Sequence, residues 1–255
     1  MNLSDKKRFI YPIALIAFIF ILWEGFVVVF NIAEYLVPKP SIIFIKLYEK
    51  FPLLLPHLYV TTIESVLGFI FGSLLGIIIA IAFTYSSTLE QSLYPYTIAL
   101  KSIPIVAIAP LLIVWFGNGI APKVIISAII TFFPVVVNMT KGLNNVEKDA
   151  FDIFDSLSAT RLQVFLKLRL LNSLPYLFAA LKMSATLSVT GAIVGEISGS
   201  NKGLGFFILI SSHRLETVDM FVGIILSSLL GVFLFYIIAI IERIIIPWEK
   251  HINIS

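Results

Sequence analysis

The sequence predicts an all-α membrane protein that crosses the bilayer six times. Apolar residues make up 59% of the 255 residues, charged residues only 13%, and the mean hydropathy is +1.02. Soluble domains of this size carry about a quarter charged residues, so a soluble globular fold is excluded. Stretches without charge, such as 65–89 and 220–241, are long enough to cross a bilayer core of about 30 Å as helices. Helices are the expected spanning elements, because the sequence lacks the alternation of apolar and polar residues that is typical of membrane β-strands.

Six spans are expected, near residues 10–30, 60–84, 97–116, 121–141, 173–196 and 218–242. The first span follows Lys6, Lys7 and Arg8 like a secretion signal, but its apolar run is longer than a signal core, so we expect it to be retained. Placing the N-terminus inside gives the cytoplasm the larger share of Lys and Arg. The sequence thus predicts a multi-pass protein of the cell membrane with both termini in the cytoplasm.

The segments between spans suggest three parts of the chain. Residues 1–59 would hold the first span and a proline-containing external connection, with a short amphipathic helix near 42–50. Residues 60–245 would form the membrane domain, which includes an external loop at 197–217. Residues 246–255 would be a cytoplasmic tail.

The longest cytoplasmic segment, about 146–172, carries the strongest pattern. Apolar residues recur at helical spacing from Val146 to Leu157, while charged residues occupy the other faces. After a break at 156–160, Thr160 and Gln163 have the spacing of a capping box, which predicts a second short helix. These two helices are either an interfacial hairpin on the lipid or a docking element for a cytoplasmic partner.

This segment resembles the EAA loop of ABC importer permeases, whose pattern is E-A-A-x3-G-x9-I-x-L-P. The spacing matches at Asp152-Ile153-Phe154, Ser158, Leu168 and Leu170. Further stretches resemble, in order, the nitrate, sulfonate and taurine branch of that family: Trp23-Glu24, 37–41, His57 with Thr61-Thr62, Gly68, 103–119, Phe133-Pro134, and Glu196 followed by Gly203-Leu204-Gly205. Together they span almost the whole chain.

The resemblance implies the type I ABC importer permease fold, also called MetI-like. The 146–172 segment would be the coupling helix that inserts into a groove on a separate ATPase. The residues expected to take part are Asp152, Ile153, Phe154, Ser158, Ala159, Thr160, Arg161 and Phe165. Two ATPase subunits and an external solute-binding protein would be partners. The cargo would be nitrate, a sulfonate, taurine, bicarbonate, a thiamine-precursor pyrimidine or riboflavin.

The loop departs from the family pattern at five positions: Asp152 replaces the glutamate, Ile153 and Phe154 the two alanines, Ser158 the glycine and Leu171 the proline. Ser158 stands where the family has glycine, and serine lacks the freedom of glycine at positive φ. We therefore expect a different backbone at this turn, or one that a partner holds. Phe154 is larger than the alanine of the family, so the matching groove of the ATPase is expected to be altered.

Catalytic motifs are missing from the sequence. No G-x-x-x-x-G-K-[ST] occurs, so this chain is not expected to hold ATP by a phosphate-binding loop. It has no cysteine, and its three histidines, His57, His213 and His251, are far apart. We expect neither an enzyme, a metal site nor a cofactor, and the small net charge of +3 does not favour nucleic acid.

Two sets of glycines recur every four residues and predict close helix packing. They are Gly68, Gly72 and Gly76 in the second span, and Gly191, Gly195 and Gly199 in the fifth. Each set could pack inside one subunit or at a dimer seam. Six helices are few to enclose a solute, so we expect a homodimer.

Charged residues within spans usually face a cavity or a partner, and prolines loosen helices. Lys101, Pro104 and Glu196 are therefore candidates for the translocation path. Lys101 and Lys182 either attract an anion or reach an interface or an acidic partner. The main alternative function is an ion-gradient-driven secondary transporter or channel, which predicts more acids along the spans. A lipid-modifying enzyme would need polar residues clustered at one membrane face.

Overall fold

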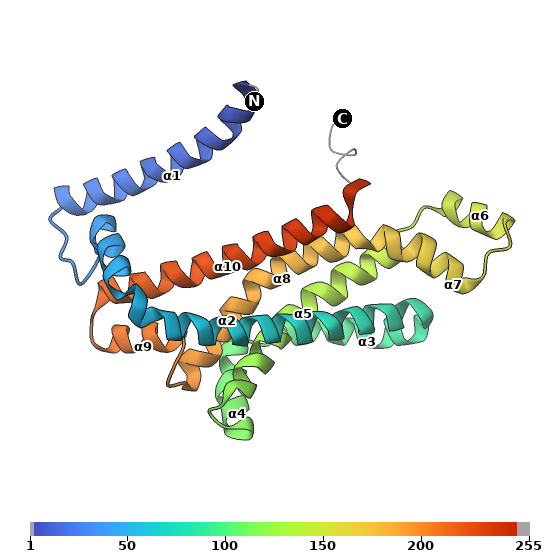
Figure 1. Cartoon of the computed structure of the whole chain (residues 1–255). Coiled ribbons are helices and arrows are strands. Elements are labelled where there is room, and N and C mark those ends of the chain that lie inside the picture. The colour runs from blue at the N-terminus through green and yellow to red at the C-terminus, as the bar shows by residue number, and fades with distance from the viewer. Residues whose placement is uncertain (1–2, 249–255) are drawn as a thin grey trace.

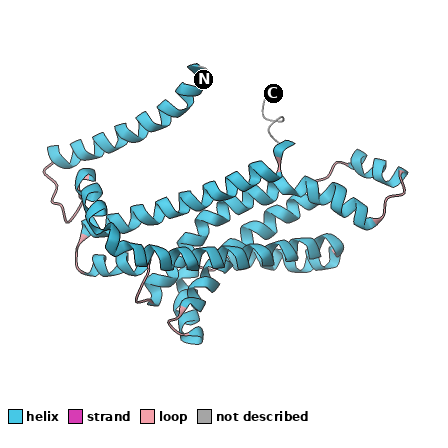
Figure 2. Ribbon diagram, in the orientation of Figure 1, coloured by secondary structure: helices cyan, strands magenta, loops and turns pink. Residues whose placement is uncertain are grey.

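The computed structural model describes residues 3–248, and within them all side chains except those of 3–10, 12, 13, 87, 98 and 100. Every regular element in this range is helical, as Figure 2 shows, which confirms the predicted fold class. The elements are α1 (Leu3–Val29), α2 (Pro40–Tyr85), α3 (Ser87–Lys101), α4 (Ile105–Phe116), α5 (Ile120–Asn144), α6 (Lys148–Ser156), α7 (Arg161–Val164), the π-helical turn η1 (Phe165–Arg169), α8 (Leu170–Gly199), α9 (Leu204–His213) and α10 (Thr217–Ile245). Most of the expected tail, 249–255, lies outside the described residues.

Four of the described helices are long and apolar enough to cross a membrane: α2, α5, α8 with its preceding turns, and α10. They contain the expected spans at 60–84, 121–141, 173–196 and 218–242, so these four predictions are confirmed. The first expected span lies in α1, of which Ala14–Val29 is a shorter apolar helix. The count of six single-helix spans is not reproduced, because the third is not one helix.

The expected span at 97–116 is divided into α3 and α4 by residues 102–104. Pro104 has no N–H to continue the helix of α3, and its ring disfavours helical backbone at the residue before it. Pro104 itself is extended, with ψ of 112°. By contrast, Pro110, Pro134 and Pro175 lie inside helices that continue past them. The prediction of one helix was wrong because only one of these prolines ends a helix.

Helix α2 also differs from expectation. The short helix predicted near 42–50 is the first part of α2, whose 46 residues run without a break to Tyr85. At 1.5 Å per residue it is about 69 Å long, roughly twice the bilayer core. Figure 1 shows its first turns at a steep angle to the rest. The bend fits Pro52 and Pro56 inside the helix, and the boundary expected at 59/60 falls within α2.

The start of α2 is stabilised by a residue of α1. The Glu24 carboxylate accepts hydrogen bonds from the backbone N–H of Ser41 at 3.0 Å and from its hydroxyl at 2.7 Å. Ser41 follows Pro40 in the first turn of α2, where helix N–H groups have no internal partner and the helix dipole favours a negative charge. Glu24 is thus a tertiary cap, which accounts for an acid inside an apolar helix.

Helix α5 lies at the centre of the bundle, between α2 and α8. A side-chain carbon added at Gly72 would collide with Thr131 and the carbonyl of Ala128, both on α5. The other contacts of the glycine sets are Gly68 and Gly191 with Ser127, Gly76 with Val135, Gly195 with Lys123, and Gly199 with Ile113 and Asn118. Both sets therefore bring helices together within one subunit, five of the six glycines against α5.

Candidate coupling segment and buried polar cluster

The α6–α7 hairpin projects from one end of the bundle, as Figure 1 shows, whereas α9 lies at the opposite end. We call the two ends the α6 end and the α9 end. Helix α6 has no buried residue. The hairpin returns through α7 and η1 directly into α8. The segment predicted from sequence is therefore an exposed helical hairpin that is continuous with a spanning helix.

The turn after α6 has the geometry that the family pattern assigns to glycine. Ser158 has φ of +52°, in the left-handed region. Its N–H donates to the Asp155 carbonyl at 2.8 Å, and the N–H of Ala159 donates to the Phe154 carbonyl at 3.0 Å. These two bonds form a Schellman motif, which normally ends on glycine. The serine adopts the glycine conformation within this chain, at a cost in backbone energy.

The second helix begins as the sequence predicts. The Gln163 N–H donates to the Thr160 hydroxyl at 3.3 Å, and the Gln163 side-chain oxygen accepts from the Thr160 N–H at 2.8 Å. This reciprocal pair is the predicted capping box, which is confirmed. It fixes where the chain turns back toward the bundle.

The hairpin presents apolar side chains to its surroundings. Ile153, Leu157 and Leu162 are 59%, 73% and 60% exposed. Among the other residues expected here, Asp152, Ser158, Thr160 and Arg161 are exposed, whereas Phe154, Ala159 and Phe165 are half-buried. Several large apolar side chains exposed on one short hairpin are typical of an interaction site.

The base of the hairpin contacts the bundle through the aromatic ring of Phe165 and the side-chain amide of Asn172. The Phe165 ring lies 5.4 Å from that of Tyr85, the last residue of α2. The Asn172 side chain donates to the carbonyls of Gly142 at 3.0 Å and Asn145 at 2.9 Å, which joins the start of α8 to the end of α5. A displacement of the hairpin would therefore act on α2, α5 and α8 together.

At the α9 end, three side chains satisfy the first N–H groups of α9. Gly203 N–H donates to the His57 ring at 3.1 Å, and Leu204 N–H donates to the Thr61 hydroxyl at 2.8 Å. Gly205 N–H donates to Glu196 at 2.5 Å. The Thr61 hydroxyl in turn donates to the other Glu196 oxygen at 2.6 Å. These are the N–H groups that a helix leaves without internal partners.

Steric constraints explain why residues 203 and 205 of this cap are glycines. Gly203 has φ of +106°, where a side chain would be strained. A side-chain carbon on Gly203 would collide with the Glu196 carboxylate, and one on Gly205 with the Ile193 carbonyl. The motif residues His57, Thr61, Glu196 and Gly203-Leu204-Gly205 are thus one hydrogen-bonded unit.

The path candidates do not meet at one place. Lys101 and Pro104 are exposed beside the break between α3 and α4. Glu196 is fully buried in the cap. The Lys182 ammonium forms an ion pair with Glu242 of α10 at 2.7 Å. Of the alternatives given for Lys182, the structure thus shows the acidic partner.

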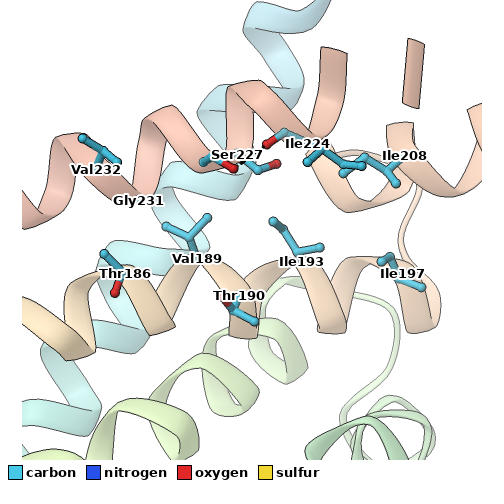
Figure 3. A pocket seen from close by; sticks show the side chains of 11 residues that line it. Thr186, Val189, Thr190, Ile193, Ile197, Ile208, Ile224, Ser227, Gly231 and Val232 are labelled. Carbon is cyan, nitrogen blue, oxygen red and sulfur yellow. Dashed lines mark hydrogen bonds between the residues drawn. The ribbon is translucent and has the colours of Figure 1, made fainter. Parts of the chain in front are cut away.

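A groove of about 460 Å³ lies between α8 and α10. Figure 3 shows its two walls, with Thr186 and Thr190 on the α8 side and Ser227 on the α10 side among Val189, Ile193 and Ile224. Hydroxyl groups spaced along an apolar wall offer hydrogen bonds without charge.

Comparisons with known proteins identify the family of this chain. Residues 72–247, more than half of the chain, match the family described as binding-protein-dependent transport system inner membrane component. The chain belongs to this permease family. It is 33% identical over 217 residues to the formylaminopyrimidine transport permease protein ThiX of Halalkalibacterium halodurans, covering 85% of this chain and 87% of that protein. It is 30% identical to a probable ABC transporter permease protein of Haemophilus influenzae, covering 91% and 94% of the two chains.

The fold of the permease matches solved structures as well. A chain of the inward-facing MetNI methionine ABC transporter superimposes with a TM-score of 0.65 at 18% identity, covering 76% of this chain and 97% of that chain. The MetI-like fold predicted from the resemblance is confirmed. The family also decides between the functions considered above: the chain is a membrane-spanning permease subunit of an ABC importer rather than an ion-driven carrier.

Sequence reasoning missed how the permease uses two of its polar residues. Lys123 lies at the start of the expected span 121–141, and the structure shows that it is 1% exposed and donates to the carbonyls of Asn118 at 2.7 Å and Gly119 at 2.9 Å. Glu64, 2% exposed, lies beside it. The four-residue spacing of His57 and Thr61 indicates one helix face, but nothing in the sequence pairs that face with Glu196.

Proposed function

We propose that two copies of this permease form the translocation path of an ATP-driven importer. Two cytoplasmic ATPase subunits would bind the α6 end, and an external solute-binding protein would deliver cargo to the α9 end. The larger cationic content of the segments at the α6 end supports its cytoplasmic location, with both chain termini on that side. Closed two-fold pairing is the commonest way to complete such an assembly.

The observation that carries this proposal is the exposed apolar surface of α6 and its turn. Ile153 and Leu157 are 59% and 73% exposed, and both lie on the segment with the EAA spacing. Exposed apolar side chains gain about 25 cal/mol for each Å² removed from water. A groove on an ATPase surface would supply that burial.

The connections of the hairpin support a transmission mechanism. Closure of the ATPase dimer on ATP would move α6, and the Asn172 and Phe165 contacts would pass the movement to α5, α8 and α2. The helices would tilt and open the path outward, and hydrolysis would reset them. Asp152, Ile153, Phe154, Ser158, Ala159, Thr160, Arg161 and Phe165 are the proposed coupling residues, and Lys101, Pro104 and Glu196 are the proposed path residues.

The cargo is proposed by likeness to relatives. Similar permeases are named for formylaminopyrimidine, riboflavin, aliphatic sulfonates, nitrate and taurine. We extend this set of small solutes to the present chain, with the choice among them left to the solute-binding protein and the external mouth of the path.

The docking test uses Ile153→Asp combined with Leu157→Asp. Both side chains are exposed, so the double variant should fold normally but lose copurification with the ATPase and lose ATP-driven uptake in proteoliposomes. Leu215→Asp is the matched control, because Leu215 is 78% exposed at the α9 end and its φ of +57° suits aspartate. Normal ATPase binding by the double variant would refute the docking assignment.

A further inference from the structure

A polar cavity of about 370 Å³ lies between the end of α2 and the α6–α7 hairpin. Tyr85 comes from α2, Asp155 from α6, Arg161 from α7, and Phe165 and Arg169 from η1. Its size is that of a pocket for a small ligand or headgroup. The exposed apolar residues proposed to dock the ATPase are not part of its lining, so the cavity is a separate feature of the hairpin.

The charge of the cavity comes from its two arginines. Arg161 is exposed and Arg169 is partly exposed, so both residues can be reached from outside the chain. In the described part of the chain, neither of them forms an ion pair within 4.0 Å. Asp155 is the acid of the lining. Two guanidinium groups against one carboxylate leave the cavity with a net positive charge.

Arg169 is positioned by an aromatic ring rather than by an acid. Its guanidinium carbon lies 5.2 Å from the centroid of the Phe151 ring, at a distance where a cation is attracted to the ring. The ring offers no oxygen acceptor to the N–H groups of the guanidinium. Five such donors in a planar fork match the oxygens of a carboxylate or a phosphate. The cavity therefore favours an anion with several oxygen atoms.

Two helices place the cavity at the depth of the lipid headgroups. Tyr85 lies 13 residues beyond residue 72, the centre of the span 60–84, which is about 20 Å along the helix at 1.5 Å per residue. Arg169 lies about 15 residues before the centre of the span 173–196, or about 23 Å. A bilayer is about 40–45 Å thick with its headgroups, so these begin to meet water about 20 Å from the midplane.

This depth favours a lipid over an acidic side chain of the ATPase as the source of the anion. The ATPase would dock on Ile153 and Leu157, which do not line the cavity. Tyr85 is 59% exposed, and exposed tyrosines at the ends of spanning helices are typical of the membrane–water interface. Basic pockets beside spanning helices on the cytoplasmic side bind anionic headgroups.

We propose that this cavity binds the headgroup phosphate of an anionic phospholipid, with Arg161 and Arg169 donating to the phosphate oxygens. The bound lipid would connect the end of α2 to the base of the hairpin at the membrane surface. This site lies outside the proposed function, since it concerns neither the cargo nor the ATPase.

The test is native mass spectrometry of the full chain in detergent without the ATPase. Dioleoylphosphatidylglycerol and dioleoylphosphatidylcholine are titrated separately, and their affinities are compared. The anionic lipid should bind at least about fivefold more tightly, because the choline group of the other lipid neutralises its phosphate. Inorganic phosphate in large excess should not displace the anionic lipid, since free phosphate lacks the acyl chains.

Three variants locate the site. Arg161→Gln and Arg169→Gln should each weaken the anionic lipid about fivefold, the usual contribution of one basic residue near an anionic membrane surface. Lys167→Gln is the matched control: Lys167 is exposed on the same turn as Arg169 but does not line the cavity, so binding should change less than twofold. Arg161 is exposed, so its variant should fold normally even if the loss of the Phe151 contact disturbs Arg169→Gln.

Several results would overturn the inference. Equal affinity for the two lipids, or equal weakening by Lys167→Gln and the arginine variants, would show attraction without a site. Displacement by inorganic phosphate would assign the cavity to a soluble anion. Arginine variants that keep the lipid but lose copurification with the ATPase would assign it to an acidic group of that partner. Because lipid binding is measured without the ATPase, its failure leaves the proposed transport function untouched.

Discussion

Replacing Ser158 with glycine should stabilise the turn between α6 and α7. A residue with a side chain is destabilised by about 1–2 kcal/mol in the left-handed region. Glycine avoids this cost, but it destabilises the folded turn by about 0.5–1 kcal/mol relative to alanine, because glycine has more conformational freedom when unfolded. With Ser158 at φ of +52°, the net gain is about 0.5–1 kcal/mol, or about two- to fivefold in the opening equilibrium of the turn. The family pattern has glycine at this position.

The assay is hydrogen exchange of the peptide that spans 154–160, in detergent and without the ATPase. The Ala159 N–H, which donates to Phe154 at 3.0 Å, should exchange about two- to fivefold more slowly in Ser158→Gly. Ser156→Gly is the matched control: Ser156 is the last residue of α6, so the same substitution should speed exchange. If Ser158→Gly exchanged as fast as wild type or faster, the strain assigned to this serine would be refuted.

Three other predictions concern packing and caps, each read from thermal unfolding in detergent unless stated. Gly72→Ala should destabilise the fold by about 1–3 kcal/mol, because the added methyl group would overlap Thr131. Gly25 has open space around it, so Gly25→Ala should leave the midpoint unchanged. Equal effects of the two variants would contradict the close packing of α2 against α5. Glu196→Gln should weaken the cap of α9 by about 1–3 kcal/mol and speed tryptic cleavage in the preceding loop, and unaltered proteolysis would count against the cap. Glu24→Ala should cost about 1 kcal/mol through loss of the tertiary cap of α2, and an unshifted midpoint would show that water replaces it.

The turn at Ser158 and the break at Pro104 show what local sequence can and cannot predict. The capping box and the two short helices followed from spacing, because caps depend on residues three or four positions apart. The break at Pro104 did not, since Pro110, Pro134 and Pro175 lie in similar sequence surroundings and stand inside helices that continue past them. Whether a helix tolerates proline depends on which neighbours satisfy the freed backbone groups.

The buried polar residues illustrate the same limit. His57, Thr61 and Glu196 could be recognised as motif residues, but their shared role as the cap of α9 required α2 and α8 to be placed side by side. Glu64 carries no motif of its own, and its unpartnered oxygen becomes visible only when every neighbour is known.

By itself the sequence determined the membrane class, four of the spanning helices, the permease family and the position of the exposed α6–α7 hairpin, since hydropathy, periodicity and motif spacing act along the chain. The tertiary structure alone decided that both glycine sets bring helices together within one subunit, that Glu24 and Glu196 each cap the helix that follows their own, and that Thr61 of α2 joins Glu196 of α8 in the second cap. Those outcomes depend on contacts between residues up to 146 positions apart, and local propensity carries no information about such distances.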